Sequence, residues 1–180
     1  MIESAKYMII MRGPSGSGKS TTASKILEDY TNRLQMTSVI CSTDSFFLDA
    51  EGIYAFDVKL LGVNHKKNQD KVKYYSDPNF PEDQKDLIII DNTNLTSSEV
   101  ETYAKIGLDN GYIIRLIVPD RLNEMDDDSL FAANTHSVPM DTIKKQREKF
   151  QTNQQVGEML AKKLNCIFNL QTESLYREPK

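Results

Sequence analysis

Short runs of apolar, β-branched residues alternate with longer amphipathic stretches along this chain. The runs are too short for helices and too continuous for strands with one wet face, and they occupy residues 7–11, 37–41, 87–90 and 112–118. Helical patterns follow at residues 21–34, 96–108, 140–150 and 152–164. This alternation predicts an α/β fold with a mostly parallel sheet and helices on both faces.

Two long polar segments interrupt the alternation. Residues 49–84 separate the second and third predicted strands, and residues 119–139 follow the fourth and contain an acidic run. Stretches of this length between strands usually form lids or partly helical caps. No repeat or linker divides the chain, so we expect one domain over residues 1–180, with an insertion at 49–84 and a lid at 119–139.

Local signals mark the ends of several elements. Thr96 and Glu99 have the spacing of a capping box at the start of a helix. The Asn110-Gly111 pair marks the turn after that helix. We expect residues 173–180 to be a fraying tail.

A complete phosphate-binding pattern lies directly after the first predicted strand and before the first helix. Residues 13–20 satisfy G-x-x-x-x-G-K-[ST]. Glycines let successive backbone N–H groups point at phosphate oxygens, and the helix adds its positive dipole end. The pattern predicts a P-loop NTPase three-layer sandwich that binds ATP, with Lys19 at the β- and γ-phosphates and Ser20 on Mg²⁺. The expected nucleotide-binding residues are Gly13, Pro14, Ser15, Gly16, Ser17, Gly18, Lys19, Ser20 and Thr21.

Two acidic residues follow predicted strands and should lie on the same edge of the sheet as this loop. Asp44 comes just after the second strand, where it either accepts a proton from an attacking hydroxyl or caps a helix. Asp91 ends the run Leu-Ile-Ile-Ile-Asp, the layout of a Walker B element. Paired with the phosphate-binding loop, Asp91 is predicted to hold Mg²⁺ opposite Ser20.

Composition limits the class of protein. A hydrophobic share of 39 % supports a packed core, and 22 basic against 26 acidic residues give a net charge of −4, which argues against nonspecific coating of nucleic acid. Cys41 and Cys166 form no CxxC pair, so a disulfide framework is excluded and a reducing compartment is indicated. Residues 1–4 lack the layout of a secretory signal, and no apolar run approaches the roughly 20 residues of a membrane span. We expect a cytoplasmic or nuclear protein that does not bind a membrane.

Four further motifs follow in a characteristic order: S-T-D-S-F-F at 42–47, H-K-K-N-Q at 65–69, D-N-T-N at 91–94 and N-T-H-S-V-P at 134–139. With the phosphate-binding loop, they resemble the polynucleotide 5′-hydroxyl kinase-like P-loop proteins over about residues 7–150, in particular the NEDD-four-binding-protein-two-like branch. The resemblance implies a nucleoside/polynucleotide kinase-like fold, ATP and Mg²⁺ as cofactors, and phosphorylation of the 5′-OH end of DNA or RNA. It also implies that Asp44 is the general base.

The chain departs from that family pattern in the lid. The family has an arginine directly before the Asn-x-His element, where this chain has Ala133. An arginine that stabilises the transferring phosphoryl group contributes roughly 10³–10⁵ in turnover. We expect Arg147 to replace it, because Arg147 shares a helical stripe with apolar residues such as Ile143; a solvent-facing head is the alternative. Arg121 is the second candidate.

The acceptor side has fewer sequence signals. Candidate substrate-binding residues are His65, Asn68, Gln69 and Asn94, with helix packing and turn formation as the alternatives. The insertion at 49–84 is predicted to form the acceptor side, and its lysines at 66, 67, 71 and 73 either follow a nucleic-acid backbone or form a solvated face. Three functions stay open: a kinase for nucleic-acid 5′-OH ends, which we favour; a kinase for a small hydroxyl acceptor such as a nucleoside or nucleotide; and a nucleotide-binding regulator that lacks the lid arginine.

Overall fold

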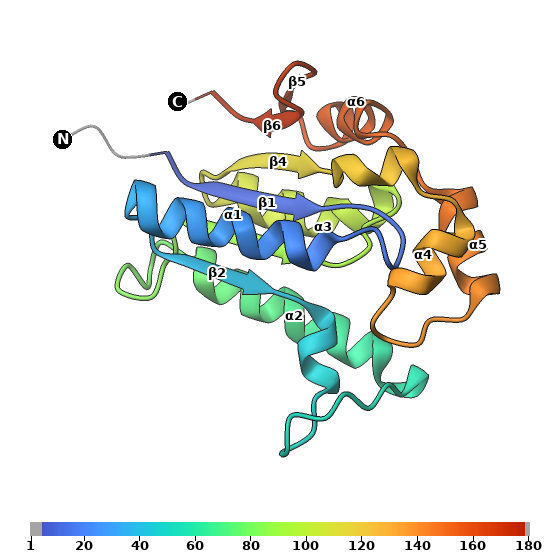
Figure 1. Ribbon diagram of the computed structural model, residues 1–180. Helices are drawn as coiled ribbons and strands as arrows, with labels where there is room; N and C mark the ends of the chain where they lie inside the picture. The colour runs from blue at the N-terminus through green and yellow to red at the C-terminus, as the bar shows by residue number, and fades with distance from the viewer. Residues whose placement is uncertain (1–4, 179–180) are drawn as a thin grey trace.

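A six-stranded, mostly parallel sheet forms the centre of the computed structural model, which describes residues 5–178 (Figure 1). The strands lie in the order β2-β3-β1-β4-β6-β5. The first four are parallel: β2 (Ser38–Cys41), β3 (Leu87–Asp91), β1 (Tyr7–Met11) and β4 (Ile113–Ile117). The four predicted strands are therefore confirmed to within one residue at each end.

Helices cover both faces of this sheet. Because successive strand residues point to opposite faces, Ile9 and Met11 pack against α1 (Lys19–Leu34), while Met8 and Ile10 lie in the larger core on the other face. That second face is covered by α2 (Leu61–Ser76), α3 (Ser97–Asp109) and α6 (Asn153–Lys163). This is the predicted three-layer fold of the P-loop NTPases in its kinase-like form. No helix within residues 5–178 is both long and apolar enough to cross a membrane.

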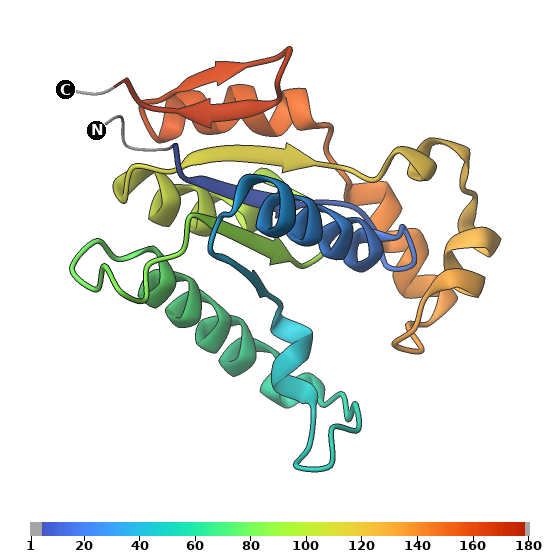
Figure 2. The same ribbon diagram turned by 60° about the vertical axis from the view of Figure 1, so that its left-hand side comes forward.

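An antiparallel hairpin extends the sheet beyond β4 (Figure 2). It consists of β5 (Ile167–Asn169) and β6 (Ser174–Tyr176). The predicted fraying tail at 173–180 is therefore wrong over β6, where Leu175 is fully buried and pairs with Ile114. Three-residue strands carry too few positions for a periodic signal, which explains the error. Residues 179–180 of that tail, and the N-terminal residues 1–4, lie outside the described residues.

The lid and the first part of the insertion lie at the end of the sheet toward which the parallel strands point, whereas α2 runs back along the sheet (Figures 1 and 2). The insertion at 49–84 follows η1 (Thr43–Phe47) and contains η2 (Val58–Leu60) and α2. Helix α2 had no apolar signature, because its buried residues at helical spacing are mostly polar: Asn64, Asn68, Val72 and Ser76. The lid contains η3 (Asp120–Glu124) and α4 (Asp127–Ala133) and leads into α5 (Met140–Lys149). It has a small core of its own, formed by Met125, Leu130 and Ile143.

The helix starts differ from the predicted pattern. Thr96 makes no side-chain capping bond, and Glu99 Oε2 instead accepts the backbone N–H of Leu95 at 2.6 Å. The expected capping box at the start of α3 is therefore wrong. A complete capping box is present at the start of α6, where Thr152 and Gln155 each accept the other's backbone N–H.

Candidate active site

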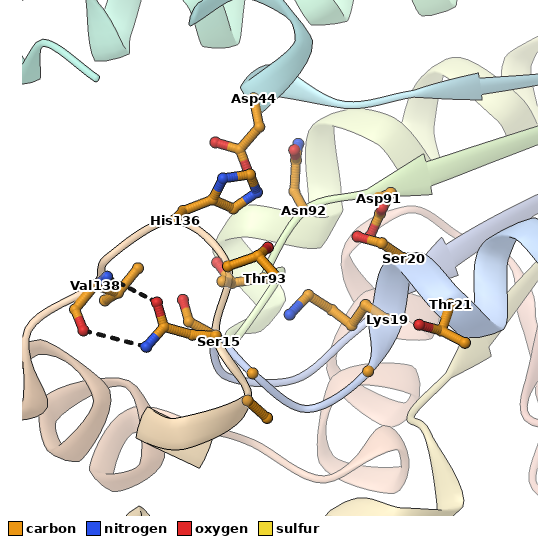
Figure 3. A pocket seen from close by; sticks show the side chains of 15 residues that line it. Ser15, Lys19, Ser20, Thr21, Asp44, Asp91, Asn92, Thr93, His136 and Val138 are labelled. Atoms are coloured by element: carbon orange, nitrogen blue, oxygen red, sulfur yellow. Dashed lines mark hydrogen bonds and ion pairs between the residues drawn. The ribbon is translucent and has the colours of Figure 1, made fainter. Parts of the chain in front are cut away.

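The phosphate-binding loop connects β1 to α1 at the carboxyl end of the sheet (Figure 3). The N-cap of α1 is Gly18, whose φ of 90° is left-handed and which offers no side-chain acceptor to the first-turn N–H groups. Gly16 also has a positive φ, of 82°, and a Cβ there would lie 2.0 Å from the carbonyl oxygen of Leu130 in α4. Only glycine fits this position, and the lid rests directly on the loop.

Lys19 lies almost completely buried at the floor of the loop, with 9 % of its surface exposed. Its ammonium donates to the carbonyl oxygen of Pro14 at 2.9 Å. Burial lowers the pKa of Lys19 to about 8, and the charges of Asp91 and Asp44 oppose that shift. A buried cation beside neutral carbonyl oxygens favours an anionic ligand, since the ligand's charge replaces the lost hydration.

Ser20 and Asp91 form an oxygen-only pair next to Lys19. The Ser20 hydroxyl lies beside the Asp91 carboxylate at the end of β3 (Figure 3). Burial raises the pKa of Asp91, and the Ser20 hydroxyl and the Lys19 charge oppose the shift. Hydroxyl and carboxylate oxygens suit Mg²⁺, which commonly takes only one or two protein ligands and completes its shell with phosphates and water. Two oxygen ligands of this kind fit a nucleotide-bound Mg²⁺. Within residues 5–178, no group of three or more acidic, His or Cys side chains is placed to hold a metal ion.

Asp44 lies in η1, just beyond β2, and both of its carboxylate oxygens have partners. The Tyr54 hydroxyl donates to Oδ1 at 3.2 Å, and His136 Nε2 lies 3.5 Å from Oδ2. The rings of Tyr54 and His136 also stack, with centroids 4.3 Å apart. Burial and the Asp44 carboxylate raise the pKa of Tyr54 to about 12, which keeps its hydroxyl a donor. The Asp44 side chain is nevertheless 46 % exposed, so a ligand can reach it.

A single pocket brings the phosphate-binding loop, both acids and the lid together. Figure 3 shows Lys19 on the loop side, and Asp44 and His136 facing one another on the other side. Of the expected nucleotide-binding residues, Gly13, Pro14 and Ser17 belong to the loop but not to the lining. The lining residues are Ser15, Gly16, Gly18, Lys19, Ser20, Thr21, Asp44, Asp91, Asn92, Thr93, Ala133, Asn134, Thr135, His136 and Val138.

Two candidate substrate-binding residues are buried structural groups instead. Asn68 is fully buried and donates to the Tyr103 hydroxyl at 2.9 Å. Asn94 is 3 % exposed and donates to the carbonyl oxygen of Met11 at 2.8 Å. Neither side chain lines the pocket, and the contacts that both make are those of the packing and turn alternatives.

The other two acceptor-side candidates also lie outside the pocket lining. His65 Nδ1 forms a 3.0 Å hydrogen bond with Thr43 Oγ1, and the Thr43 backbone N–H donates to Asn92. His65 therefore helps to hold η1, the segment that carries Asp44. Gln69 lies half-buried on α2.

The expected position of Arg147 is wrong. Its guanidinium lies 3.0 Å from the Asp127 carboxylate, on an exposed part of α5 that does not line the pocket. The second candidate, Arg121, lies against the loop: a Cβ on Gly18 would be 3.1 Å from Arg121 Cδ. Ala133 does line the pocket, at the position where the family resemblance places an arginine.

Arg12, directly before the loop, is fully buried and has a structural role. Its guanidinium donates to the carbonyl oxygens of Asn94, Leu95 and Gln151 and to the side chain of Asn153. These bonds tie the start of the loop to the segment between β3 and α3 and to the residues where α6 begins.

Sequence reasoning missed two side chains that contact Asp44. His136 had a signal, since it belongs to the N-T-H-S-V-P motif at 134–139, but that motif by itself did not indicate a contact with Asp44. Tyr54 had none: it lies in the polar insertion and reaches Asp44 only after a turn closed by the Leu48–Tyr54 bridge.

The fold and this site define a P-loop protein of the kinase-like type. Residues 8–153 match the AAA domain family, and the chain belongs to that family. NEDD4-binding protein 2 of Homo sapiens is 33 % identical over 144 residues, which are 80 % of this chain and 8 % of that protein. The resemblance to this branch is thereby confirmed. A chain in the solved "Structure of Pnkp1/Rnl/Hen1 complex" matches with a TM-score of 0.49 and 21 % identity, over 73 % of this chain and 40 % of that chain. The chain thus spans less than half the length of either protein.

Proposed function

We propose that this chain is an ATP-dependent kinase that transfers the γ-phosphate to a hydroxyl acceptor, and we favour the 5′-OH end of DNA or RNA as that acceptor. The observation that carries the proposal is the single pocket in which Lys19 and Asp44 face the same space. Lys19 marks the donor side and Asp44 the acceptor side, which is the arrangement that phosphoryl transfer requires.

On the donor side, the loop amides and Lys19 would bind and orient the β- and γ-phosphates. Ser20 and Asp91 would hold Mg²⁺, which neutralises phosphate charge when bound. The fold already holds the buried ammonium of Lys19 at the floor of the loop, so binding of the phosphates requires little rearrangement of this side chain.

On the acceptor side, Asp44 would accept the hydroxyl proton as the acceptor oxygen attacks the γ-phosphorus. The new O–P bond forms while the bond to the β–γ bridging oxygen breaks, and ADP leaves with that oxygen. Tyr54 and His136 hold the carboxylate in place at its two oxygens. A positioned base of this kind contributes roughly 10²–10⁴ in rate.

The direct test is transfer of labelled γ-phosphate from ATP to a panel of acceptors: 5′-OH DNA, 5′-OH RNA, nucleosides and nucleoside monophosphates. Label on the polynucleotides supports the favoured acceptor. Label on the small acceptors alone would move the function to a nucleoside or nucleotide kinase.

One observation favours a second candidate function, a nucleotide-binding regulator. Ala133 lines the pocket where the family resemblance places an arginine, and an alanine cannot stabilise the transferring phosphoryl group. Tight ATP binding with no label on any acceptor would support this regulator and reject the kinase.

A further inference from the structure

The insertion and the residue before it present several exposed apolar side chains. Each is about half exposed or more: Leu48, Ile53, Phe56, Val58, Leu60 and Val63. Four rings of this region also form a continuous row. Phe56 lies 5.1 Å from Phe47, Phe47 lies 6.1 Å from Tyr54, and Tyr54 lies 4.3 Å from His136, measured between ring centroids.

This row of rings ends at the carboxylate of Asp44. Tyr54 and His136 contact one oxygen each. A molecule that presents a hydroxyl group to Asp44 would approach close to His136, which lines the pocket, and to Tyr54, which contacts Asp44 from outside the lining. Because aromatic faces offer stacking area rather than charge, they favour an acceptor with a flat ring next to its hydroxyl-bearing carbon.

The basic residues of the insertion are largely engaged with the protein itself. Lys66 and Lys73 both pair with Asp70, and Lys71 donates to the carbonyl oxygen of Ile40 at 3.2 Å. Asp70 therefore offsets part of the positive charge of Lys66 and Lys73, although both side chains stay exposed. None of these lysines lines the pocket beside Asp44, whereas the ring of His136 does.

We propose, building on the proposed kinase function, that Tyr54 and His136 form the binding site for the terminal base of a nucleoside acceptor. The base stacks on the Tyr54 ring, and the 5′-hydroxyl of the same nucleoside reaches Asp44. Recognition is then concentrated on the terminal nucleoside, so a short acceptor binds nearly as well as a long one, and binding weakens little with added salt.

The kinetic test compares two 5′-OH oligonucleotides that differ only at the first residue, which carries either a base or an abasic sugar analogue. The wild-type protein is expected to favour the base-bearing acceptor by about 10-fold in kcat/KM, equivalent to about 1.4 kcal/mol. Tyr54→Leu should remove this preference by raising KM for the base-bearing acceptor. Tyr54→Phe keeps the ring and should keep the preference, whatever its effect on kcat.

The matched control is Phe80→Leu, which removes an exposed ring from the turn after α2, away from the pocket lining. It should keep the full preference. An unchanged preference in Tyr54→Leu overturns the proposal. In particular, an equal loss of kcat/KM for both acceptors in Tyr54→Leu would show that the ring pair only closes the site.

A binding measurement separates this proposal from the kinase function. An oligonucleotide with 2-aminopurine at its 5′ end should lose fluorescence on binding to the wild-type protein and to Tyr54→Phe, but not on addition of Tyr54→Leu. Quenching that depends on Tyr54 without any phosphate transfer would reject the kinase and retain the base site. Transfer without such quenching would reject the base site and retain the kinase.

Discussion

His136 Nε2 lies 3.5 Å from Asp44 Oδ2, across the mouth of the pocket. The two residues come from different segments, since Asp44 follows β2 and His136 belongs to the stretch between α4 and α5. The lid therefore touches the acceptor side through this pair, and touches the donor side where Leu130 meets Gly16. Both halves of the site depend on where the lid lies.

The proposed base role of Asp44 makes a clear kinetic prediction. Asp44→Asn should lower turnover by roughly 10²–10⁴, because an amide cannot take the hydroxyl proton. ATP affinity should stay within about twofold, since the change lies on the acceptor side. Steady-state kinetics and equilibrium binding of ATP check the two parts, with Asp83→Asn, an exposed acid after α2, as the control. A collapse of ATP–Mg²⁺ affinity with unchanged turnover would show that Asp44 binds metal instead.

The strands and the loop could be predicted because their signals are local. Buried parallel strands need unbroken apolar runs, as in β1 and β3, and the phosphate-binding loop needs glycines at fixed positions beside one lysine. The acids Asp44 and Asp91 followed from topology, since the carboxyl ends of parallel strands share one edge of the sheet. Each of these inferences requires only neighbours in sequence or a rule of sheet connection.

The remainder of the site depends on tertiary packing that no periodicity encodes. Tyr54 reaches Asp44 because a loop folds back on itself, and Asn68 is buried because α2 packs through polar side chains against Tyr103. Arg147 was misplaced because α5 covers only the small lid core. That core buries Ile143 alone on α5, so the apolar stripe is too narrow to bring Arg147 inward.

Removal of the Lys19 charge should impair both ATP binding and phosphoryl transfer. Lys19→Met keeps the length of the side chain but loses the ammonium, so we expect turnover to fall by at least about 10²-fold and ATP to bind more weakly. Calorimetric titration with ATP and a transfer assay measure both effects. Lys25→Met, an exposed lysine one helical turn and a half later on α1, should leave both unchanged. Wild-type turnover in Lys19→Met would refute the assignment of the loop.

Cys41 predicts how stability depends on pH. Burial raises the pKa of its thiol from the ordinary value near 9 to about 11, so the folded protein keeps a proton that the unfolded chain releases. The resulting stability is fully present below pH 9 and is lost as the pH rises to 11, by about 2–3 kcal/mol.

Denaturant unfolding of the wild type and of Cys41→Ala across this range measures that loss. The variant should start less stable, because a buried side chain is truncated, and the difference should shrink above pH 9. Val72→Ala is the control, since it truncates a fully buried side chain that does not titrate. A difference that stays constant from pH 8 to 11 would contradict the prediction.

Removal of the two arginines near the site should lower turnover to very different extents. Arg121 lies against Gly18 at the start of α1, where a cation can meet phosphate charge, so Arg121→Ala should lower turnover by about 10²-fold or more. Arg147 pairs with Asp127 on the surface, and Arg147→Ala should change turnover by less than about threefold. The two variants remove the same group, from the lid and from the helix that follows it, so each serves as the control for the other. A large loss in Arg147→Ala alone would mean that α5 turns toward the pocket when ATP binds.

Ala133→Arg tests whether the pocket lacks a cation that can stabilise the transferring phosphoryl group. Ala133 ends α4 and lines the pocket, so an arginine there has a path to the transferring phosphoryl group. If Arg121 already supplies that charge, Ala133→Arg should change turnover little in the wild-type background. In the Arg121→Ala background, Ala133→Arg should restore much of the lost turnover, because one guanidinium can replace the other. Turnover of the four proteins in this double-mutant cycle gives the coupling directly. A strong gain in the wild-type background, with no effect of Arg121→Ala, would show that the lid lacks its cation and that Arg121 does not supply one.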